Sequence, residues 1–449
     1  MLSDKIRAEY HALINEHMEQ NRRGALALRE NIERSDLHFR GYISKALQIP
    51  NIYTEETRKR FEEIVSVTYG ICEKVIREYV KNEQYRALFG FSKEAEELIL
   101  LDPGYPCALP LARFDLFYHE DTGEFWFCEF NTDGSTGMNE SRLQDAFMIH
   151  NPAHQEMRRR YHLQMMELMD SWVRAFLDIY STYEHRTRHP NIAIIDFLEK
   201  GNLREFEEFA RRFQQAGANC EICDIRDLTF CDGKLISPAG HVVDAVYRRA
   251  VTSDILNAQN EVKPFLDAVR SGACFVAGSF RTQIVHHKNL FHVLHLPQTL
   301  AILSPAEQAF VQAHVPWTVP FSKDAVERSA VERQKDRFIL KPEDSYGSKG
   351  VYAGVDYDQS SWEKIVQDTY ENGYICQTYC PQCLVENIDF AWGDGKWHPF
   401  IEMPGLYCYN GKFSGVFTRA GGGSGIIDPH MNKRVQPTYF AEGKYGEAF

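Results

Sequence analysis

The sequence lacks the features that mark membrane and secreted proteins. No apolar run is long enough to span a bilayer, and Met1–Arg7 contain no apolar core of the kind found in signal peptides. The 11 cysteines are scattered and odd in number, which indicates reduced thiols rather than a disulfide framework. We therefore expect a cytoplasmic protein with no membrane partner.

Positive charge is scarce. Lys and Arg number 50 against 63 Asp and Glu, a net charge of -13, so the chain has no general basic field for a nucleic-acid partner. No internal repeat or low-complexity segment is present. Hydrophobic residues at 44% and charged residues at 25% indicate a globular chain, and 449 residues suffice for two or three subdomains.

Zinc-binding and nucleophilic motifs are also missing. Cys220/Cys223 and Cys380/Cys383 form two Cys-x-x-Cys pairs, but they lie far apart and beside strand-like sequence, where cysteine is usually a small buried residue. The histidines, such as His286-His287, show no ligand spacing, and no Ser-His-Asp or Cys-His arrangement is evident. We expect no zinc site and no covalent nucleophile.

The strongest chemical signal lies in the stretch Phe125–Glu140. It begins as an apolar, aromatic run suited to a buried strand, and within it Glu129 and Asn131 stand two residues apart, so both side chains share a face. A loop rich in Gly, Ser, Thr and Asp follows, and a helix begins near Met138. Carboxylate and carboxamide oxygens suit Mg²⁺ rather than zinc.

A second strand at residues 112–118 precedes this stretch, with a turn at residues 121–124. In an antiparallel hairpin, Arg113 and Asp115 fall near Glu129 and Asn131. Three oxygen ligands and a guanidinium then converge, as metal-bound phosphates require. The alternative, open at this point, is a polar strand edge with a satisfied asparagine turn.

Helical periodicity dominates residues 1–100, where 55–82 reads as a long amphipathic helix, and we expect a helical outer layer or lid there. Helical patterning returns at residues 138–183, interrupted at Asn151-Pro152. Neither region carries evident chemistry.

In residues 191–300 the apolar periodicity alternates between that of strands and that of helices. Expected strands lie at residues 191–196, 219–224, 244–249 and 274–276, a hairpin at 230–236, and helices at 203–216, at 253–269 and around Lys288. This alternation predicts a parallel sheet with ligands at its carboxyl edge. Arg248 and Arg249 end one strand there, where they either grip a substrate carboxylate or merely solvate the surface.

The third part begins near Pro305. A strand at residues 337–342 carries Lys341, a loop at 343–350 follows, and a second strand is expected at 351–355. Such a loop can fold over phosphates through backbone N–H groups, although Gly-Ser-Lys-Gly is also ordinary turn chemistry. It is not a Walker loop, because no helix opens after the lysine.

Further elements complete this part. A helix is expected at residues 360–371, a strand at 374–379, and more strands up to Arg419, which precedes the glycine-rich segment 420–425. That segment can approach a ligand closely or serve as a flexible turn.

Taken in order, these motifs resemble an ATP-grasp ligase of the circularly permuted branch that contains glutathionylspermidine synthetases and eukaryotic-type glutathione synthetases. The resemblance spans about residues 100 to 430 and rests on ordered motifs. They are Arg113-x-Asp115, Glu129-x-Asn131-x-Asp133, Tyr247-Arg248-Arg249, Lys288, Lys341 with the Ser-Lys-Gly loop, the Gln377 strand, and Arg419 with its glycines. The chain lacks the additional amidase domain of bifunctional family members.

The resemblance implies a set of roles. ATP would lie between two antiparallel sheets of the third part, and a Mg²⁺ ion would bridge its phosphates. The implied ATP-binding residues are Lys288, Lys341, Ser345, Gly347, Ser348, Lys349, Gly350, Gln377 and Tyr379. The implied metal ligands are Asp115, Glu129 and Asn131, the catalytic cations Arg113 and Arg419, and the substrate-binding residues Ser135, Arg248 and Arg249.

The implied activity is ADP-forming amide ligation between small-molecule or peptide carboxylate and amine substrates, through an acyl phosphate. The expected fold class is α/β (α+β), an ATP-grasp fold with four regions. These are a helical layer at 1–100, a metal-binding hairpin with helices at 101–190, a parallel-sheet substrate subdomain at 191–300, and nucleotide-binding lobes at 301–449. Two other functions stay open: a catalytically silent ATP-binding regulatory module, and a kinase that stops at the phosphorylated product.

Overall fold

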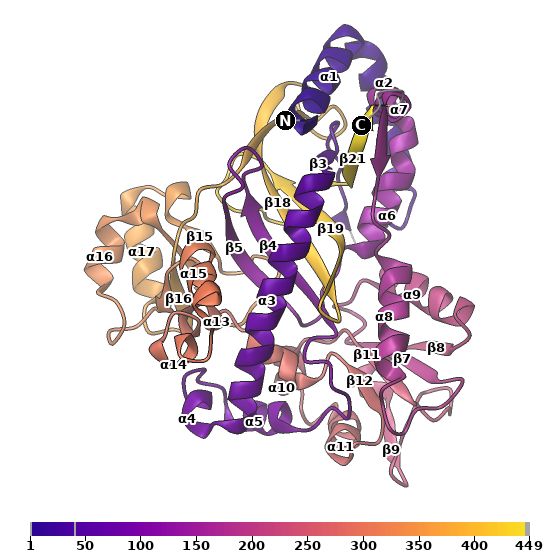
Figure 1. The fold of residues 1–449 in the computed structure, drawn as a ribbon, viewed down its shortest axis with the longest axis vertical. Coiled ribbons are helices and arrows are strands. Elements are labelled where there is room, and N and C mark those ends of the chain that lie inside the picture. The colour runs from indigo at the N-terminus through magenta and orange to yellow at the C-terminus, as the bar shows by residue number, and fades with distance from the viewer. Residues whose placement is uncertain (1, 40–41, 445–449) are drawn as a thin grey trace.

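The computed structural model shown in Figure 1 describes residues 2–39 and 42–444 as a mixed α/β structure with several separate sheets. Residues 1, 40–41 and 445–449, which belong to the predicted first and last regions, lie outside the described residues. In the described part, no helix combines the length and apolarity needed to cross a membrane.

The largest sheet is antiparallel and joins distant parts of the sequence. Its order is β20-β19-β18-β4-β5, with β17 also paired to β18. The strands are β4 (Leu111–Tyr118), β5 (Phe125–Asn131), β17 (Leu384–Ile388), β18 (Trp397–Tyr409), β19 (Lys412–Gly421) and β20 (Arg434–Gln436). The predicted hairpin and the C-terminal strands therefore share one sheet, across the expected boundaries at residues 190 and 301.

Helix α3 (Glu55–Lys81) packs against this sheet and crosses it in Figure 1. The predicted amphipathic helix at 55–82 is thus confirmed. Thr54 caps it by accepting a hydrogen bond from the backbone N–H of Thr57, and Phe61 and Ile64 are among its buried residues. An apolar stripe on one face is what fixes a helix on a sheet.

The second large sheet is parallel, as predicted. Its order is β12-β11-β7-β8, with β7 (Asn191–Asp196), β8 (Asn219–Asp224), β11 (Ala245–Arg248) and β12 (Phe275–Ala277). Helices α8 (Met169–Tyr180), α9 (Leu203–Gln215) and α11 (Lys263–Ser271) lie beside it. Strands β7, β11 and β12 are largely buried, as parallel strands covered on both faces require, whereas the edge strand β8 is partly exposed.

A third, antiparallel sheet has the order β13-β16-β14-β15, with β13 (Thr318–Pro320), β14 (Phe338–Pro342), β15 (Tyr352–Ala353) and β16 (Tyr374–Thr378). Helices α15 (Pro305–His314), α16 (Arg328–Arg333) and α17 (Gln359–Thr369) accompany it. The expected strand at 351–355 is only two residues long, because a 3-10 turn begins at Gly354.

A small sheet, β3-β21-β6, pairs the last strand of the described chain with two earlier strands, and the two ends of the chain lie near each other in Figure 1. Its strands are β3 (Asn51–Thr54), β21 (Thr438–Lys444) and β6 (Tyr161–Gln164). Around it stand α1 (Leu2–Glu16), α2 (Met18–Glu33), α6 (Met138–Phe147) and α7 (Pro152–Arg160).

The remaining elements are short. They are β1 (His38–Phe39), β2 (Tyr42–Ile43), α4 (Glu83–Arg86), α5 (Lys93–Leu100), β9 (Thr229–Cys231), β10 (Lys234–Ile236), α10 (Thr252–Asn257), α12 (Gln283–His286), α13 (Leu290–Val293) and α14 (Pro297–Leu300). Strands β9 and β10 form the predicted hairpin.

Three helix predictions were wrong in detail. Residues 161–164 form β6 because they pair with β21, a partner far away in sequence. The helix expected at 253–269 is two helices, and Pro264 stands in the first turn of the second, where proline is tolerated. Lys288 lies in the turn between α12 and α13, because His287 adopts an extended backbone that ends α12.

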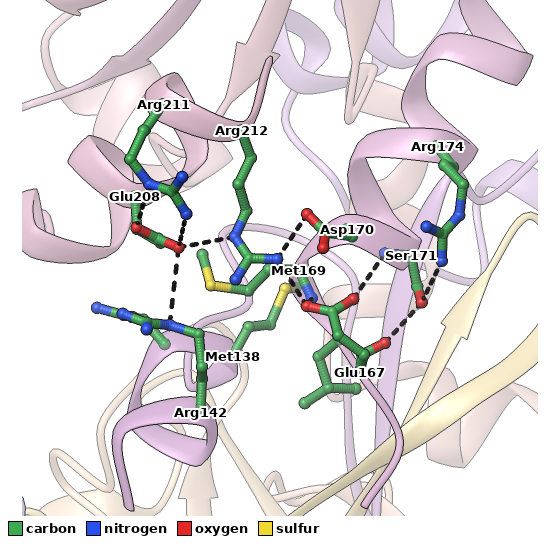
Figure 2. Close-up of polar contacts among 12 residues, drawn as sticks. Met138, Arg142, Glu167, Met169, Asp170, Ser171, Arg174, Glu208, Arg211 and Arg212 are labelled. Atoms are coloured by element: carbon green, nitrogen blue, oxygen red, sulfur yellow. Dashed lines mark hydrogen bonds and ion pairs between the residues drawn. The ribbon is translucent and has the colours of Figure 1, made fainter. Parts of the chain in front are cut away.

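A cluster of charged side chains fixes α9 against α8 and the start of α6, and Figure 2 shows it. The Arg212 guanidinium contacts Glu208 at 2.8 Å, Glu167 at 2.8 Å and Asp170 at 2.6 Å. Burial opposes ionisation of Glu208, but hydrogen bonds from Arg211 and Arg212 lower its pKa to about 2. The orientation of α9 matters because this helix carries a buried carboxylate into the site described next.

Candidate active site

Two adjoining cavities share part of their lining. The first, here called the inter-sheet cavity, lies between β14 and β16 on one side and β4, β5, β18 and β19 on the other. The second, here called the edge cavity, measures about 480 Å³ and is bounded by the β5–α6 loop, the carboxyl edge of the parallel sheet and the segment after β19. Glu129, Tyr346, Arg419 and Ile427 line both cavities and mark their junction.

The β4–β5 hairpin brings Arg113 and Asp115 near Glu129 and Asn131, as predicted, with Arg113 opposite Asn131 and Asp115 opposite Glu129. Asp115 is fully buried and lines neither cavity. It accepts hydrogen bonds from Arg113 at 2.8 and 3.1 Å and from Asn131 at 2.7 Å, and it pairs with Arg419. Asp115, predicted as a metal ligand, thus stands behind the site, where it orients two arginines and an amide.

Glu129 and Asn131 face the cavities instead. The Asn131 amide nitrogen donates to both Asp115 and Glu129, and no donor to its Oδ1 atom occurs among the described residues, so that oxygen can face a ligand. Burial opposes ionisation of Glu129, but the cations Lys288, Arg419 and Lys341 prevail and lower its pKa to about 2. Glu129 therefore carries its charge at any physiological pH.

These two residues fit a magnesium ion. No group of three or more His, Cys, Asp or Glu side chains with metal-binding geometry occurs in residues 2–39 and 42–444. Mg²⁺ does not need such a group, because proteins hold it through one or two carboxylates while substrate phosphates and water supply the other oxygens. An ionised carboxylate beside a free amide oxygen is that kind of donor set.

Two buried lysines flank the junction. Lys288 donates to the Ser345 carbonyl at 2.6 Å, and its Nζ atom lies 4.0 Å from Glu129. Burial lowers the pKa of Lys288. Lys341 donates to the Cys128 carbonyl at 3.0 Å and to the Gln377 side chain at 2.8 Å.

The Gln377 side chain therefore holds Lys341, and it also donates to Thr318 at 2.9 Å. Tyr379 follows β16 and lines the inter-sheet cavity. The predicted slot between two antiparallel sheets exists, but β4 and β5 from the earlier part of the chain build one of its walls.

The loop after β14 is divided between the cavities. Ser345, Tyr346 and Ser348 line the inter-sheet cavity and Gly347 lines the edge cavity, whereas Lys349 and Gly350 line neither. Lys349 stacks on the Tyr346 ring at 5.2 Å, and Gly350 packs against Tyr374 and Pro342.

Two contacts close the inter-sheet cavity on this side. Ser348 donates to the Ile427 carbonyl at 3.1 Å, which ties the loop to the glycine-rich segment. Asp356 accepts hydrogen bonds from Ser424 at 2.8 Å and from the Gly425 N–H at 2.7 Å. The two glycine-bearing loops thus meet over the cavity.

The β5–α6 loop forms one wall of the edge cavity. Ser135 donates to the Asn131 carbonyl at 2.8 Å, and Arg113 and Tyr407 both donate to the Thr136 carbonyl, at 2.6 and 2.7 Å. The backbone of this loop is therefore held from two sides, with Ser135 at the cavity surface.

Buried Glu205 of α9 anchors the same loop. Its carboxylate accepts from the N–H groups of Gly137 and Asn139, both at 3.1 Å, and pairs with Arg249 at 3.1 Å. The sequence analysis missed Glu205. The available signal was the position of Glu205, four residues before Phe209 on the apolar face of α9. A charged side chain on such a face needs a buried partner.

Arg248 and Arg249 end β11 in different surroundings. The Arg248 side chain is fully buried, lies outside both cavities, and pairs with Asp133 at 2.7 Å. Its other N–H groups donate to the protein, including the Gly278 and Ala250 carbonyls. Arg248 therefore has no donor left for a substrate, whereas Arg249 lines the edge cavity.

A glycine that the sequence analysis did not single out permits the hairpin network. Gly405 on β18 stands opposite Asp115, and a Cβ atom there would lie 2.4 Å from Asp115 and 2.8 Å from Arg113. Any side chain would displace the carboxylate that aligns both arginines. The close approach of β18 and β4 is visible only once the sheet is assembled.

Asp196, at the end of β7, also lines the edge cavity and is buried. Burial raises its pKa from 3.8 to about 7, although Arg249 acts in the opposite direction. Because the folded state holds this proton up to about pH 7, folding loses stability as pH rises from about 4 to about 7.

We therefore expect Asp196→Asn to stabilise the protein at pH 8, where the native carboxylate is ionised, by about 1–3 kcal/mol. At pH 5 the two proteins should differ much less. Denaturant unfolding at both pH values measures this. Equal stability differences at pH 5 and pH 8 would contradict it.

Sequence comparisons and structural comparisons give different results. No protein-family model matches the chain, and no curated protein matches it in sequence. A glutathione synthetase-like effector from Globodera pallida, solved in its apo form, has a TM-score of 0.59 at 12% identity, with 93% of this chain and 96% of that chain covered.

Two further solved structures are less similar. A proposed gamma-glutamylcysteine synthetase from Methylobacillus flagellatus KT has a TM-score of 0.35 at 11% identity, with 86% of this chain and 89% of that chain covered. The D-cycloserine synthetase DcsG has a TM-score of 0.26 at 17% identity, with 42% of this chain and 58% of that chain covered. The comparisons thus show a fold shared with the glutathione synthetase-like effector along nearly the whole chain.

Proposed function

We propose that this chain is a Mg-ATP-dependent carboxylate–amine ligase that forms ADP and an amide through an acyl phosphate. The observation that carries the proposal is the junction of the two cavities. There Glu129 and Arg419 stand between an inter-sheet cavity walled partly by apolar side chains and a polar cavity large enough for a substrate. The fold shared with the glutathione synthetase-like effector supports it.

In this proposal the nucleotide occupies the inter-sheet cavity with its phosphates toward the junction. Lys288, Lys341 and Ser348 would contact the phosphates, and Gln377 would hold Lys341 in place. Phosphoryl transfer needs positioning and neutralisation of charge more than a protein nucleophile. Buried lysines with fixed partners meet that need.

Glu129 and Asn131 would hold Mg²⁺, whose chemistry is to neutralise charge on the β- and γ-phosphates. Arg419 would stabilise the charge that develops as the substrate carboxylate attacks the γ-phosphorus atom. A bond forms between the carboxylate oxygen and this phosphorus, and the bond to ADP breaks. Asp115 orients Arg113 and Arg419 for this step without touching the reactants.

The amine would then attack the acyl carbon, lose a proton and displace inorganic phosphate, which leaves the amide. This step must exclude water, because water would hydrolyse the acyl phosphate. The contacts of Ser348 with Ile427 and of Asp356 with Ser424 would hold the two loops over the site.

An ADP-release assay over a panel of carboxylates and amines tests the proposal. We expect ADP only when ATP, Mg²⁺, one acid and one amine are all present, with an amide in the mass spectrum of the products. Release of ADP that never depends on adding both partners would exclude ligation. Tight Mg-ATP binding by calorimetry without turnover would favour a silent regulatory module, and a phosphorylated product without amide would favour a kinase.

A further inference from the structure

Among the described residues, the edge cavity contains one carboxylate without a counter-ion, Asp196. Asp196 is 8% exposed, and its one hydrogen bond in the described part of the chain is from the neighbouring Phe197 N–H at 2.8 Å. It forms no ion pair there. A buried carboxylate that lacks a cation is costly for folding, and such groups concentrate at sites that bind a ligand.

The other acids around this cavity are already neutralised. Asp133 pairs with Arg248 at 2.7 Å, Glu140 with Lys433 at 3.2 Å, and Asp254 with Lys200 at 2.7 Å. These three cations are therefore paired with other acids. Among the described acids around the cavity, Asp196 differs in having no such pair.

Arg249 is the cation that most opposes the rise that burial causes in the pKa of Asp196, and it too has other partners. It donates to Tyr247 at 2.6 Å and to Glu205 at 3.1 Å, and its buried Nε atom has no partner among the described residues. No hydrogen bond or ion pair joins Arg249 to Asp196 among the described residues, so this cation does not serve as its counter-ion. A buried carboxylate oxygen without a partner, on a residue that lines a cavity, indicates a ligand that donates hydrogen bonds rather than a packing defect.

The backbone leaves the carboxylate accessible. A Cβ atom at Gly201 would lie 2.6 Å from the Oδ2 atom of Asp196, so any larger residue would cover the oxygen that accepts no hydrogen bond. Glycine at this position keeps that oxygen open to the cavity.

We propose that Asp196 binds a primary ammonium group of a substrate at a position remote from the reacting atoms. Asp196 does not line the inter-sheet cavity, so it lies away from the junction where phosphoryl transfer is proposed. An amine held there as an ammonium ion has no free electron pair for attack. The bound ammonium is therefore a second amino group, carried either by a donor acid with a free amino terminus or by a diamine or polyamine acceptor.

This inference rests on the proposed function only in calling the ligand a substrate, so its test measures binding without nucleotide. Calorimetry at pH 8 compares 1,4-diaminobutane, alanylalanine and N-acetylalanylalanine. We expect the native protein to bind at least one of the first two and not the acetylated dipeptide. Binding of the diamine alone identifies the acceptor as the source of the ammonium, and binding of the dipeptide alone identifies the donor.

Two variants give the comparison. Asp196→Asn should weaken binding at least about tenfold, the effect of losing one charge-assisted hydrogen bond. Asp224→Asn is the matched control, because Asp224 is the register partner of Asp196 on β8 but already pairs with Arg226 and lines neither cavity. It should bind like the native protein. Melting temperatures confirm that both variants are folded.

The pH profile adds a readout that a structural role would not change. The charges of Arg249, Lys200 and Asp254 act on the pKa of Asp196. Below about pH 7 the Asp196 carboxyl takes up a proton. Binding by the native protein should weaken there, and binding by Asp196→Asn should not follow this profile. No binding by the native protein, or equal binding by Asp196→Asn, would overturn the inference. Ammonium binding without ADP release would overturn the proposed function and leave the subsite standing.

Discussion

Glu129→Gln should abolish ADP release while the protein stays folded. The substitution keeps the shape of the side chain but removes the carboxylate that, alone among the described residues, lines both cavities. Loss of several kcal/mol of charge stabilisation at the transferring phosphoryl group corresponds to a rate decrease of at least about 10²-fold. ADP release at saturating substrates, expressed per folded molecule, measures it.

The glutamine variant should also be less stable than the native protein. The pKa of Glu129 is lowered to about 2 because its charge is surrounded by cations, so the ionised carboxylate stabilises the fold at neutral pH. The glutamine variant should therefore lose about 1–2 kcal/mol, less than the full shift implies, because solvent reaches the side chain.

Glu307→Gln provides the control. Glu307 pairs with Lys74 at 2.6 Å and lines neither cavity, so this variant loses an ion pair but should keep its activity. If Glu129→Gln and Glu307→Gln release ADP at the same rate per folded molecule, the metal-binding role of Glu129 is wrong.

Arg248→Met should lower the free energy of unfolding by about 3–5 kcal/mol, because it leaves the buried Asp133 carboxylate without its cation. Asp133 also accepts from the Thr252 N–H at 2.6 Å, so the start of α10 loses support as well. Denaturant unfolding measures the change. This result would give Arg248 a structural role in place of the substrate contact that its position at a strand end predicts.

The same substitution at Arg226 is the control, since the Arg226 side chain is partly exposed to solvent and pairs with exposed Glu199 as well as with Asp224. Arg226→Met should cost less than about 1 kcal/mol. A substrate-gripping Arg248 would behave differently. Its loss would raise the KM of the folded fraction tenfold or more while stability changed little, and that outcome would contradict the assignment.

The sequence by itself determined the elements that depend on local pattern. The β4–β5 hairpin and the shared face of Glu129 and Asn131 follow from strand alternation and a short turn, which are short-range constraints. The register that places Asp115 opposite Glu129 also depends on an irregularity between Asp115 and Leu116, which the strand pattern does not predict. The parallel sheet followed from alternating periods, since each strand and helix buries its own apolar face.

Tertiary structure decided which charges are free. Arg248 and Arg249 are adjacent and chemically alike in sequence, yet one is enclosed by Asp133 and backbone carbonyls while the other reaches the cavity. Asp115 and Glu129 differ in the same way. The partners of Arg249 and Asp115, which are Glu205 and Arg419, lie far away in sequence, so no local pattern predicts these pairs.

The same reason explains the wrong helix at 161–164 and the shared antiparallel sheet. β6 exists because β21 offers hydrogen-bonding groups at its edge, and β4 and β5 complete a sheet begun by strands nearly 300 residues further on. Non-local pairing overrides local propensity, because a buried backbone group must find a partner wherever the fold provides one. The sequence therefore determined which residues could do the chemistry, and the tertiary structure decided which of them face the cavities.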